Sequence, residues 1–174
     1  MTRSDSPIYL GELNQTPVGD LRIAASDLGL VAVEWADSQP DLERILRRLA
    51  RPVKPDAARI VPYATQLREY FNGQRREFTF AVDWETLRPF QRAVLQIVFA
   101  IPYGETTTYA DIAAQLGRSN ACRAVGRANA TNPMPLVIPC HRVIGRDGKL
   151  HGYGGGQGLK TKEWLLKMEG AVIA

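Results

Sequence analysis

The chain has 174 residues and a hydrophobic content of 45%, which suits one large domain or two small ones and excludes a disordered chain. Its longest apolar stretch, residues 94–101, is interrupted by Gln96 and is too short to span a bilayer. The N-terminus has no apolar signal core, so we expect a cytoplasmic protein that does not enter membranes.

The net charge of +4 is unevenly distributed along the chain. Residues 1–85 hold 11 Lys/Arg against 13 Asp/Glu, a balance of −2, and residues 86–174 hold 11 against 5, a balance of +6. This bias indicates that a polyanion meets the second half, although ordinary surface solvation is the alternative.

The cysteine and histidine content is small. The two cysteines, Cys122 and Cys140, fit a reducing compartment better than a disulfide scaffold. The two histidines, His141 and His151, form no cluster with metal-ligand spacing, so we expect no metal site.

Short β-like runs alternate with turn signals through the first third of the chain. The runs at residues 7–10, 21–25 and 30–35 predict a small antiparallel meander. An amphipathic helix is predicted at 41–50, with Asp41 as its cap and an apolar face of Leu42, Ile45, Leu46 and Leu49. We expect a loop at 51–55, a helix at 64–71 and a strand at 78–82 to complete a non-catalytic scaffold.

A domain boundary is expected near residues 83–86, which gives domains at 1–85 and 86–174. A helix is predicted at 89–100, with its apolar face made by Phe90, Val94, Ile97 and Val98.

Residues 106–132 predict a helix-turn-helix. Thr108 and Asp111 have capping-box spacing, and Gly117 is expected to stop the first helix, whose inner face carries Ile112 and Leu116. Ser119 can cap the second helix, at about 120–130.

The second of these helices offers small residues instead of base-reading side chains. The small residues are Ala121, Cys122, Ala124, Gly126 and Ala128, and they are accompanied by Arg123 and Arg127. A helix of this kind can approach the minor groove closely without reading its sequence, whereas a major-groove helix carries side chains that reach base edges. Tight packing against another helix explains the same pattern equally well.

Cys140 follows an apolar run and a proline. Pro139 favours an extended Ile138, so we expect the cysteine at the end of a strand-like, half-buried segment. A thiol is inert unless its proton is removed, and His141 could remove it directly or through a water. Neighbouring side chains in a strand face opposite ways, which requires a turn or a bridging water. The alternative is a cysteine buried for packing alone.

The C-terminal part begins with a turn at 146–148 and a glycine-rich loop at 151–158 around Tyr153. The loop lacks the features of a P-loop or a dinucleotide fingerprint, and we interpret it as a pliable wall for a small planar ligand. The last helix is predicted at 161–169, ended by Gly170, with Trp164, Leu165 and Met168 facing inward.

Five motifs between residues 103 and 170 carry a resemblance to a known family: PCHRV at 139–143, RAVG at 123–126, NP at 132–133, GYGG at 152–155, and WLL at 164–166 followed by EG at 169–170. In order and spacing they resemble the O6-alkylguanine-DNA alkyltransferase family; the first 85 residues match only in general layout. The resemblance implies an α/β fold with an N-terminal ribonuclease-H-like domain containing an antiparallel sheet. It also implies a mostly helical C-terminal domain with a winged-helix-like helix-turn-helix.

The implied activity is that of a methylated-DNA–[protein]-cysteine S-methyltransferase, which performs direct-reversal DNA repair. Such a protein flips O6-methylguanine, and also O4-methylthymine, out of the duplex and moves the alkyl group irreversibly onto its own cysteine. It acts once, needs no cofactor, and binds double-stranded DNA through the minor groove as a monomer with little sequence preference.

The resemblance also assigns roles to residues. Cys140 accepts the alkyl group, His141 takes the thiol proton through a water, Glu169 fixes the histidine tautomer, and Asn132 braces the turn. Tyr109 rotates the target nucleotide and neutralises the leaving guanine, and Arg123 fills the gap left by the base. The remaining DNA contacts are Ala121, Cys122, Ala124, Gly126 and Arg127, and the base pocket is Tyr109, Pro135, Val143, Tyr153 and Gly154.

This chain departs from the family pattern in the glycine-rich loop. The loop is slightly longer through Gln157 and Gly158, and it has Gly154 and Gly155 where many members carry a hydroxyl residue or an arginine. The added length bears on pocket size and substrate range, and the two glycines leave only backbone contacts to the base oxygen. Cys122 is expected to be a packing residue, although its oxidation or a disulfide with Cys140 would inactivate the protein.

Three alternative functions are open. A damage sensor of the same family would flag lesions without repairing them, but its acceptor cysteine is usually replaced by tryptophan. A helix-turn-helix transcription factor would bind one operator sequence. A thiol hydrolase using Cys140, His141 and Glu169 would turn over many times.

Overall fold

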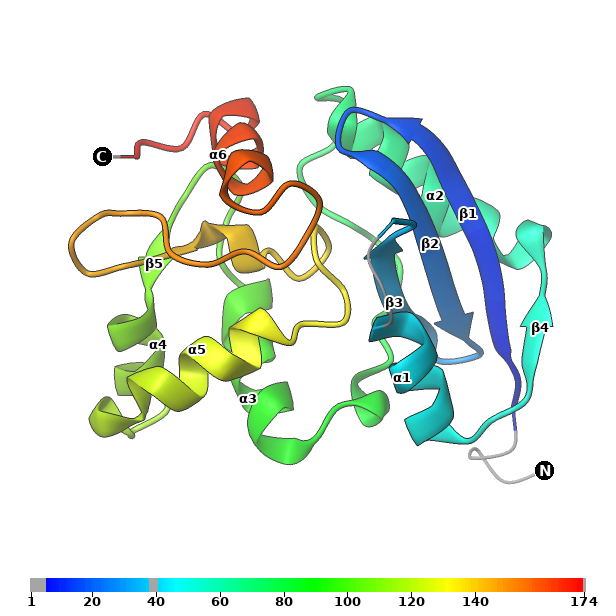
Figure 1. Cartoon of the computed structure of the whole chain (residues 1–174), viewed down its shortest axis with the longest axis horizontal. Coiled ribbons are helices and arrows are strands. Elements are labelled where there is room, and N and C mark those ends of the chain that lie inside the picture. Colours follow the sequence, from blue (N-terminus) through cyan, green and yellow to red (C-terminus); the bar gives the residue numbers. More distant parts are fainter. Residues whose placement is uncertain (1–5, 38–40, 174) are drawn as a thin grey trace. The chain divides into compact units, whose positions relative to one another are not determined.

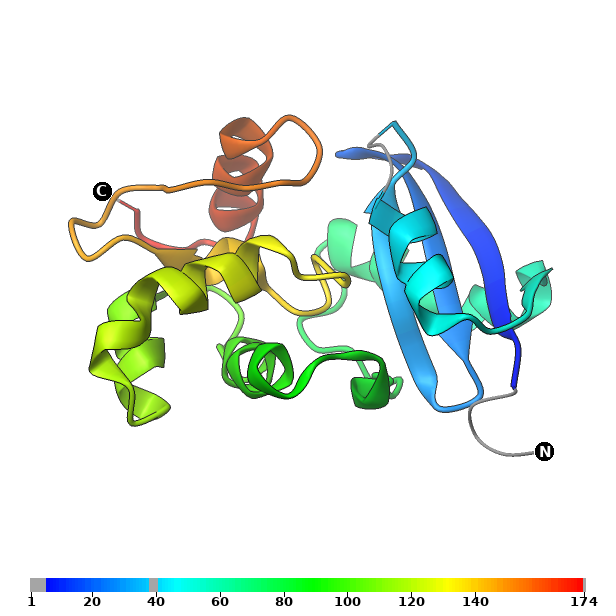
Figure 2. The same cartoon turned by 60° about the horizontal axis from the view of Figure 1, so that its bottom comes forward.

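The computed structural model describes residues 6–37 and 41–173, and the chain divides into two compact units, Met1–Thr86 and Leu87–Ala174 (Figures 1 and 2). Each unit is described by itself. Within the described ranges, no helix is long and apolar enough to cross a membrane.

A four-stranded sheet forms the centre of the N-terminal unit. Its first three strands are β1 (Ile8–Thr16), β2 (Gly19–Ser26) and β3 (Gly29–Trp35), and they pair antiparallel, which confirms the predicted meander. Residues 51–55 were expected to form a loop. This is wrong for Val53–Pro55, which form β4, a strand parallel to β1 at the edge of the sheet. A proline is tolerated there because an edge strand need not use every N–H.

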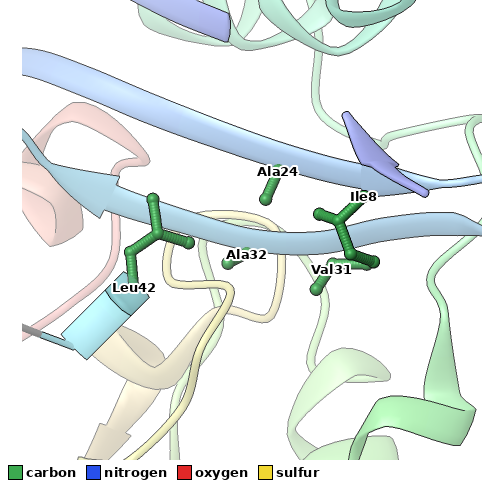
Figure 3. Packing of buried hydrophobic residues seen from close by; sticks show 5 residues of the cluster. All are labelled: Ile8, Ala24, Val31, Ala32 and Leu42. Carbon is green, nitrogen blue, oxygen red and sulfur yellow. The ribbon is translucent and has the colours of Figure 1, made fainter. Parts of the chain in front are cut away.

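One face of this sheet is covered by α1 (Asp41–Leu49). Its predicted apolar face is confirmed, because buried Leu42 packs with strand residues (Figure 3), and the other members of the packed set are Ile8, Leu10, Ala24, Val31, Ala32, Ile45, Leu46 and Leu49. The predicted cap is wrong. Asp41 is the first helical residue, and the carboxylate that accepts the Leu42 N–H, at 2.8 Å, belongs to Glu34 of β3.

The opposite face is covered by α2 (Ala57–Phe71). Figures 1 and 2 show α1 and α2 on opposite sides of the sheet. A Cβ added to Gly11 would lie 2.9 Å from Ile60 of α2, whereas the adjacent Leu10 packs with the cluster that contains Leu42 of α1, and adjacent strand residues face opposite sides. The helix begins seven residues earlier than predicted, since Asp56 caps it by accepting the Arg59 N–H and the internal Pro62 lies on its exposed side.

Residues 78–82 do not form the predicted strand. They make a single parallel bridge, between Leu30 and Val82. The reason is that the Gln66 side chain of α2 binds both the N–H and the hydroxyl of Thr79, each at 2.9 Å, and so replaces a ladder partner. Aromatic rings also pack this segment on α2: Phe78 with Tyr70 and Phe80 with Tyr63. A short 3₁₀ helix, Trp84–Thr86, ends the unit.

The C-terminal unit begins with α3 (Pro89–Phe99). The predicted helix is confirmed, but its buried residues are Val94, Leu95 and Val98, while Phe90 and Ile97 are only half-buried. The predicted apolar face was therefore displaced by part of a turn.

The predicted pair of helices follows as α4 (Tyr109–Gln115) and α5 (Cys122–Ala130), joined through the 3₁₀ turn Ser119–Ala121. The capping box is confirmed, with Asp111 N–H bound to the Thr108 hydroxyl at 3.1 Å and Thr108 N–H to the Asp111 carboxylate at 3.2 Å. The predicted Ser119 cap is wrong, because Ser119 lies inside the 3₁₀ turn and α5 starts directly after Ala121.

Two short strands, β5 (Thr107–Thr108) and β6 (Val143–Ile144), pair in parallel, and α6 (Leu159–Met168) closes the unit. Gly170, at φ +75°, follows the last helical turn as predicted. The prediction that Trp164 faces inward is wrong, because it is 38% exposed. The buried residues of α6 are Thr161, Lys162, Leu165 and Leu166.

Candidate functional site

A compact turn, not a strand, carries Cys140. Ile138 N–H binds the Met134 carbonyl at 2.8 Å, Leu136 has a left-handed backbone with φ +74°, and Cys140–Arg142 form a 3₁₀ helix. The predicted strand-like segment is therefore wrong. The cause is the Asn132 side chain, which donates to the Ile138 carbonyl at 2.8 Å and accepts the Met134 N–H at 2.9 Å, closing the turn from both ends.

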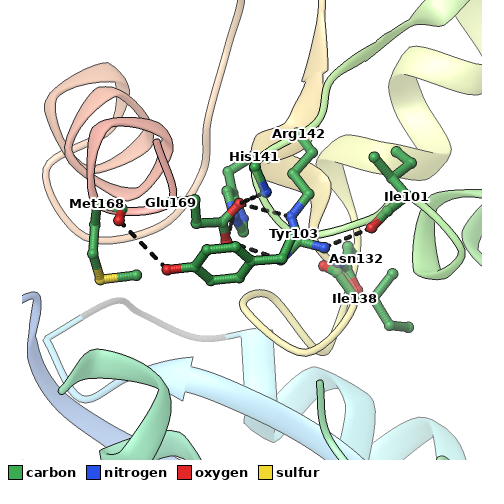
Figure 4. A network of polar contacts seen from close by, with 9 residues as sticks. Ile101, Tyr103, Asn132, Ile138, His141, Arg142, Met168 and Glu169 are labelled. Atoms are coloured by element: carbon green, nitrogen blue, oxygen red, sulfur yellow. Dashed lines mark hydrogen bonds and ion pairs between the residues drawn. The ribbon is translucent and has the colours of Figure 1, made fainter. Parts of the chain in front are cut away.

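Glu169, the residue directly after α6, binds the two residues that follow the cysteine, His141 and Arg142 (Figure 4). His141 Nε2 lies 2.8 Å from Oε1, and Arg142 donates through Nε to Oε2 at 2.8 Å and through Nη2 to Oε1 at 2.9 Å. The third nitrogen of Arg142 binds the Ile101 carbonyl at 2.6 Å. Burial opposes ionisation of Glu169, but the hydrogen bonds from His141 and Arg142 outweigh it and lower its pKa to about 2.

The ionised carboxylate determines the histidine tautomer. Because Glu169 can only accept, Nε2 of His141 carries the proton and Nδ1 is left as an acceptor. Nδ1 is buried and has no hydrogen-bond partner among residues 6–37 and 41–173. Burial lowers the pKa of His141, although the hydrogen bond that it donates to Glu169 opposes this, so the ring is neutral at pH 7.

The thiol is also neutral at rest. Burial raises the pKa of Cys140, which is 6% exposed, and this outweighs the opposing effects of the Asn132 side chain and the Lys162 charge. A neutral thiol beside a neutral imidazole with a free acceptor atom is poised to lose its proton only when it reacts.

Lys162 is a buried cation that the sequence analysis missed. Its side chain is fully buried, and Nζ donates to the Val143 carbonyl at 2.7 Å and to the His151 carbonyl at 2.9 Å. Burial lowers its pKa to about 8. The spacing of residues 162, 165, 166 and 169 could have placed it on the inner face of α6.

Two phenols are sensitive to the charge that the thiol acquires when it ionises. Burial raises the pKa of Tyr109, the first residue of α4, and an ionised Cys140 adds to this effect. Burial also raises the pKa of Tyr153 well above its usual value, with contributions from an ionised Cys140 and from Glu169. The two predicted tyrosines therefore share the electrostatic environment of the cysteine.

The other predicted pocket residues are less uniformly placed. Val143 is buried and held by Lys162, and a Cβ on Gly154 would lie 3.9 Å from the Ala130 carbonyl at the end of α5. Pro135 is half-buried in the Asn132 turn.

Three of the predicted DNA-contacting residues lie on the exposed side of α5. Arg123, Ala124 and Arg127 are exposed, and Ala121, Cys122 and Gly126 are half-buried. The inner side carries Asn129, a second residue that the sequence analysis missed, whose Nδ2 donates to the Cys140 carbonyl at 3.3 Å. One helix therefore presents two arginines outward and touches the cysteine inward.

Across the described ranges, no group of three His, Cys, Asp or Glu side chains is arranged to hold a metal ion. Fold and site together define a two-unit α/β protein with a buried cysteine beside a histidine–carboxylate pair.

Comparison with known proteins places this arrangement in a family. The model described as 6-O-methylguanine DNA methyltransferase, ribonuclease-like domain, matches residues 9–84, and the model for the DNA binding domain of the same proteins matches residues 89–171. The chain therefore belongs to the 6-O-methylguanine DNA methyltransferase family. The predicted family and fold class, including the ribonuclease-like N-terminal part, are confirmed.

Individual relatives agree with this assignment. The methylated-DNA–protein-cysteine methyltransferase of Salmonella typhimurium is 39% identical over 168 residues, covering 94% of this chain and 97% of that protein. The constitutive enzyme of Bacillus subtilis is 37% identical over 160 residues, covering 89% and 92%. The crystal structure of the Mycobacterium tuberculosis O6-methylguanine methyltransferase has a TM-score of 0.77 at 36% identity, covering 94% of this chain and 93% of that chain. A structure of M. tuberculosis OGT in complex with DNA has a TM-score of 0.75 at 36% identity, covering 94% and 92%.

Proposed function

We propose that this chain is a methylated-DNA–protein-cysteine methyltransferase that repairs O6-methylguanine by moving the methyl group onto Cys140, once per molecule. The names of its relatives support this assignment. The observation that carries it is the His141–Glu169 pair, at 2.8 Å, which leaves a buried basic nitrogen on the residue next to the cysteine. A methyl acceptor needs this arrangement because only the thiolate is a good nucleophile.

The transfer combines proton transfers with one substitution at the methyl carbon. The thiol proton passes to Nδ1 of His141 through a water, and the sulfur attacks the methyl carbon while the carbon–O6 bond breaks. The electron pair of that bond stays on the guanine, which takes a proton from Tyr109. The proton held by His141 later restores the phenol through solvent. The products are S-methylcysteine and guanine, and the thioether has no leaving group to reverse the step.

The exposed side of α5 is suited to binding DNA. Arg123 and Arg127 lie one helical turn apart beside small residues, a pattern suited to phosphates and a close minor-groove approach with little sequence preference. Flipping a base costs a few kcal/mol, which Arg123 can offset by filling the gap. The M. tuberculosis structure in complex with DNA supports DNA as a partner. We infer that a cytoplasmic monomer suffices, and that O4-methylthymine is a second substrate.

The test is the intact mass of the protein before and after incubation with a duplex containing O6-methylguanine. We expect a gain of one methyl group per molecule, mapped to Cys140 by peptide analysis and absent from the Cys140→Ala variant. Binding of the duplex without a mass gain would instead make the protein a damage sensor.

The stoichiometry separates the remaining alternatives in the same assay. A thiol hydrolase would release products in excess of protein and leave the mass unchanged, and a transcription factor would require one operator sequence. Equal methyl gain from duplexes of unrelated sequence, saturating at one per protein, would exclude both.

A further inference from the structure

Asn129 occupies a buried position between α5 and the cysteine turn, and the mechanism above does not use it. The residue is 5% exposed, and Nδ2 donates to the Cys140 carbonyl at 3.3 Å. That bond fixes the orientation of the carboxamide, because Oδ1 in its place would face another acceptor. Oδ1 is buried and has no hydrogen-bond partner within the described parts of the chain.

The same side of α5 faces Tyr109. A Cβ on Gly126 would lie 4.0 Å from the Tyr109 ring, and Asn129 is three residues further along, so the two positions share a helix face. The carboxamide therefore lies where it can contact both the Cys140 backbone and the phenol.

We propose that Asn129 is a positioning residue for methyl transfer, which holds the Cys140 carbonyl with one N–H and offers the other N–H to the Tyr109 oxygen. The inference rests on the proposed function. A phenol oxygen that accepts from Asn129 keeps its own O–H free to point at the target base. The same N–H then stabilises the phenolate that forms when the proton leaves.

The electrostatics of the phenol agree with this geometry. Burial and the neighbouring Cys140 raise the pKa of Tyr109, and a hydrogen bond from Asn129 opposes them by lowering it. Asn129 is thus the group that opposes the rise in the pKa of this buried phenol.

A purely structural asparagine would make a different prediction. Asn129→Leu leaves the Cys140 carbonyl without its donor, which lowers stability whatever the role of the asparagine. If Asn129 serves the reaction, the loss of rate depends on the presence of the Tyr109 hydroxyl, whereas the loss of stability does not.

The experiment is a double-variant cycle on single-turnover methyl transfer from the O6-methylguanine duplex, with protein in excess and mass as the readout. We expect Asn129→Leu to slow transfer about tenfold, the effect of one hydrogen bond to a charged group. In the Tyr109→Phe background the same change should alter the rate less than about twofold, since it acts through the phenol. The loss of rate that accompanies ionisation of Tyr109 should also move to higher pH in Asn129→Leu, because the phenol loses a contact that lowers its pKa.

Two further variants keep the test decisive. Asn129→Asp preserves the shape but replaces the N–H donor by a charge, so it should be slower than Asn129→Leu even if the leucine variant folds poorly. Asn14→Leu makes the same change on exposed β1 and should leave the rate unaltered. Equal slowing by Asn129→Leu in both Tyr109 backgrounds, or a wild-type rate for Asn129→Asp, would overturn the inference. Failure of the wild-type protein to gain a methyl group would instead refute the proposed function.

Discussion

The guanidinium of Arg142 donates hydrogen bonds to both oxygens of the Glu169 carboxylate, at 2.8 and 2.9 Å, and both side chains are almost fully buried. Glu169 thus serves His141 and Arg142 at once. The arginine keeps the carboxylate ionised, and the ionised carboxylate holds the proton of His141 on Nε2. A structural ion pair therefore controls which nitrogen of the histidine can act as a base.

Removing the arginine should be severely destabilising. Arg142→Met leaves Glu169 buried without its main partner, a change that typically costs about 3–5 kcal/mol. Urea unfolding followed by circular dichroism measures it. The matched control is Lys167→Met, which breaks the exposed Lys167–Glu163 pair on α6 and should cost less than about 0.5 kcal/mol. Similar losses in the two variants would contradict the role given to the buried pair.

Stability should fall with acid in two ranges. The pKa of Glu169 is about 2 in the folded protein and ordinary when unfolded, so its contribution is complete above about pH 4.5 and lost as pH falls toward 2. This loss is on the order of 3 kcal/mol. His141 acts earlier, because its folded pKa is lowered and below about pH 6.5 the unfolded chain binds a proton that the folded protein does not. Unfolding free energies measured from pH 3 to 8 should decline below 6.5, and His141→Gln should remove that first decline. A flat profile between pH 7 and 4 would refute the assignment.

Lys162 should make the reaction sensitive to mild alkali. Its pKa of about 8 means that the ammonium is lost above that pH, and with it a charge that favours the Cys140 thiolate. We expect the transfer rate at saturating duplex to fall as pH rises through 8, before Tyr109 can ionise. Lys162→Met should be slower at pH 7 and should show no fall near pH 8. A fall near pH 8 that persists in the variant would have another source.

The two exposed arginines of α5 should have different effects. Arg127→Ala should weaken binding equally for all sequences and reduce the salt dependence of log K by about one phosphate contact, with the rate at saturation unchanged. Arg123→Ala should lower the rate at saturation as well, because it no longer compensates for base flipping. Fluorescence anisotropy across salt concentrations and single-turnover rates measure the two effects. Arg44→Ala, on the exposed surface of α1, is the control.

Some periodic and local signals in the sequence predicted the fold correctly, although the caps expected at Asp41 and Ser119 were wrong. The apolar spacing of α1 and the Thr108–Asp111 capping box both depend on neighbours three or four residues apart, and both are present in the structure. Residues 78–82 have strand-like alternation, yet the backbone N–H of Thr79 binds the Gln66 side chain of α2 and not a neighbouring strand. Such a tertiary bond leaves no local pattern.

The sequence predicted which residues form the site better than it predicted their geometry. The residues around Cys140 and Glu169 were identified, but the turn that carries the thiol depends on Asn132 bonding across six residues to Ile138, which apolar composition cannot indicate. Lys162 and Trp164 show the same limit. Hydropathy favours an inward tryptophan and an outward lysine, whereas two backbone carbonyls bind the ammonium and keep it inside.

The turn before the cysteine stores conformational strain. Leu136 adopts a left-handed backbone conformation, which costs a non-glycine residue about 1–2 kcal/mol. The two hydrogen bonds of the Asn132 side chain and the complete burial of the leucine side chain hold it in this conformation. The cysteine turn is thereby ordered when the chain folds. For the single methyl transfer proposed above, no product release limits the rate, so the speed of that event depends on how much of this ordering has already taken place.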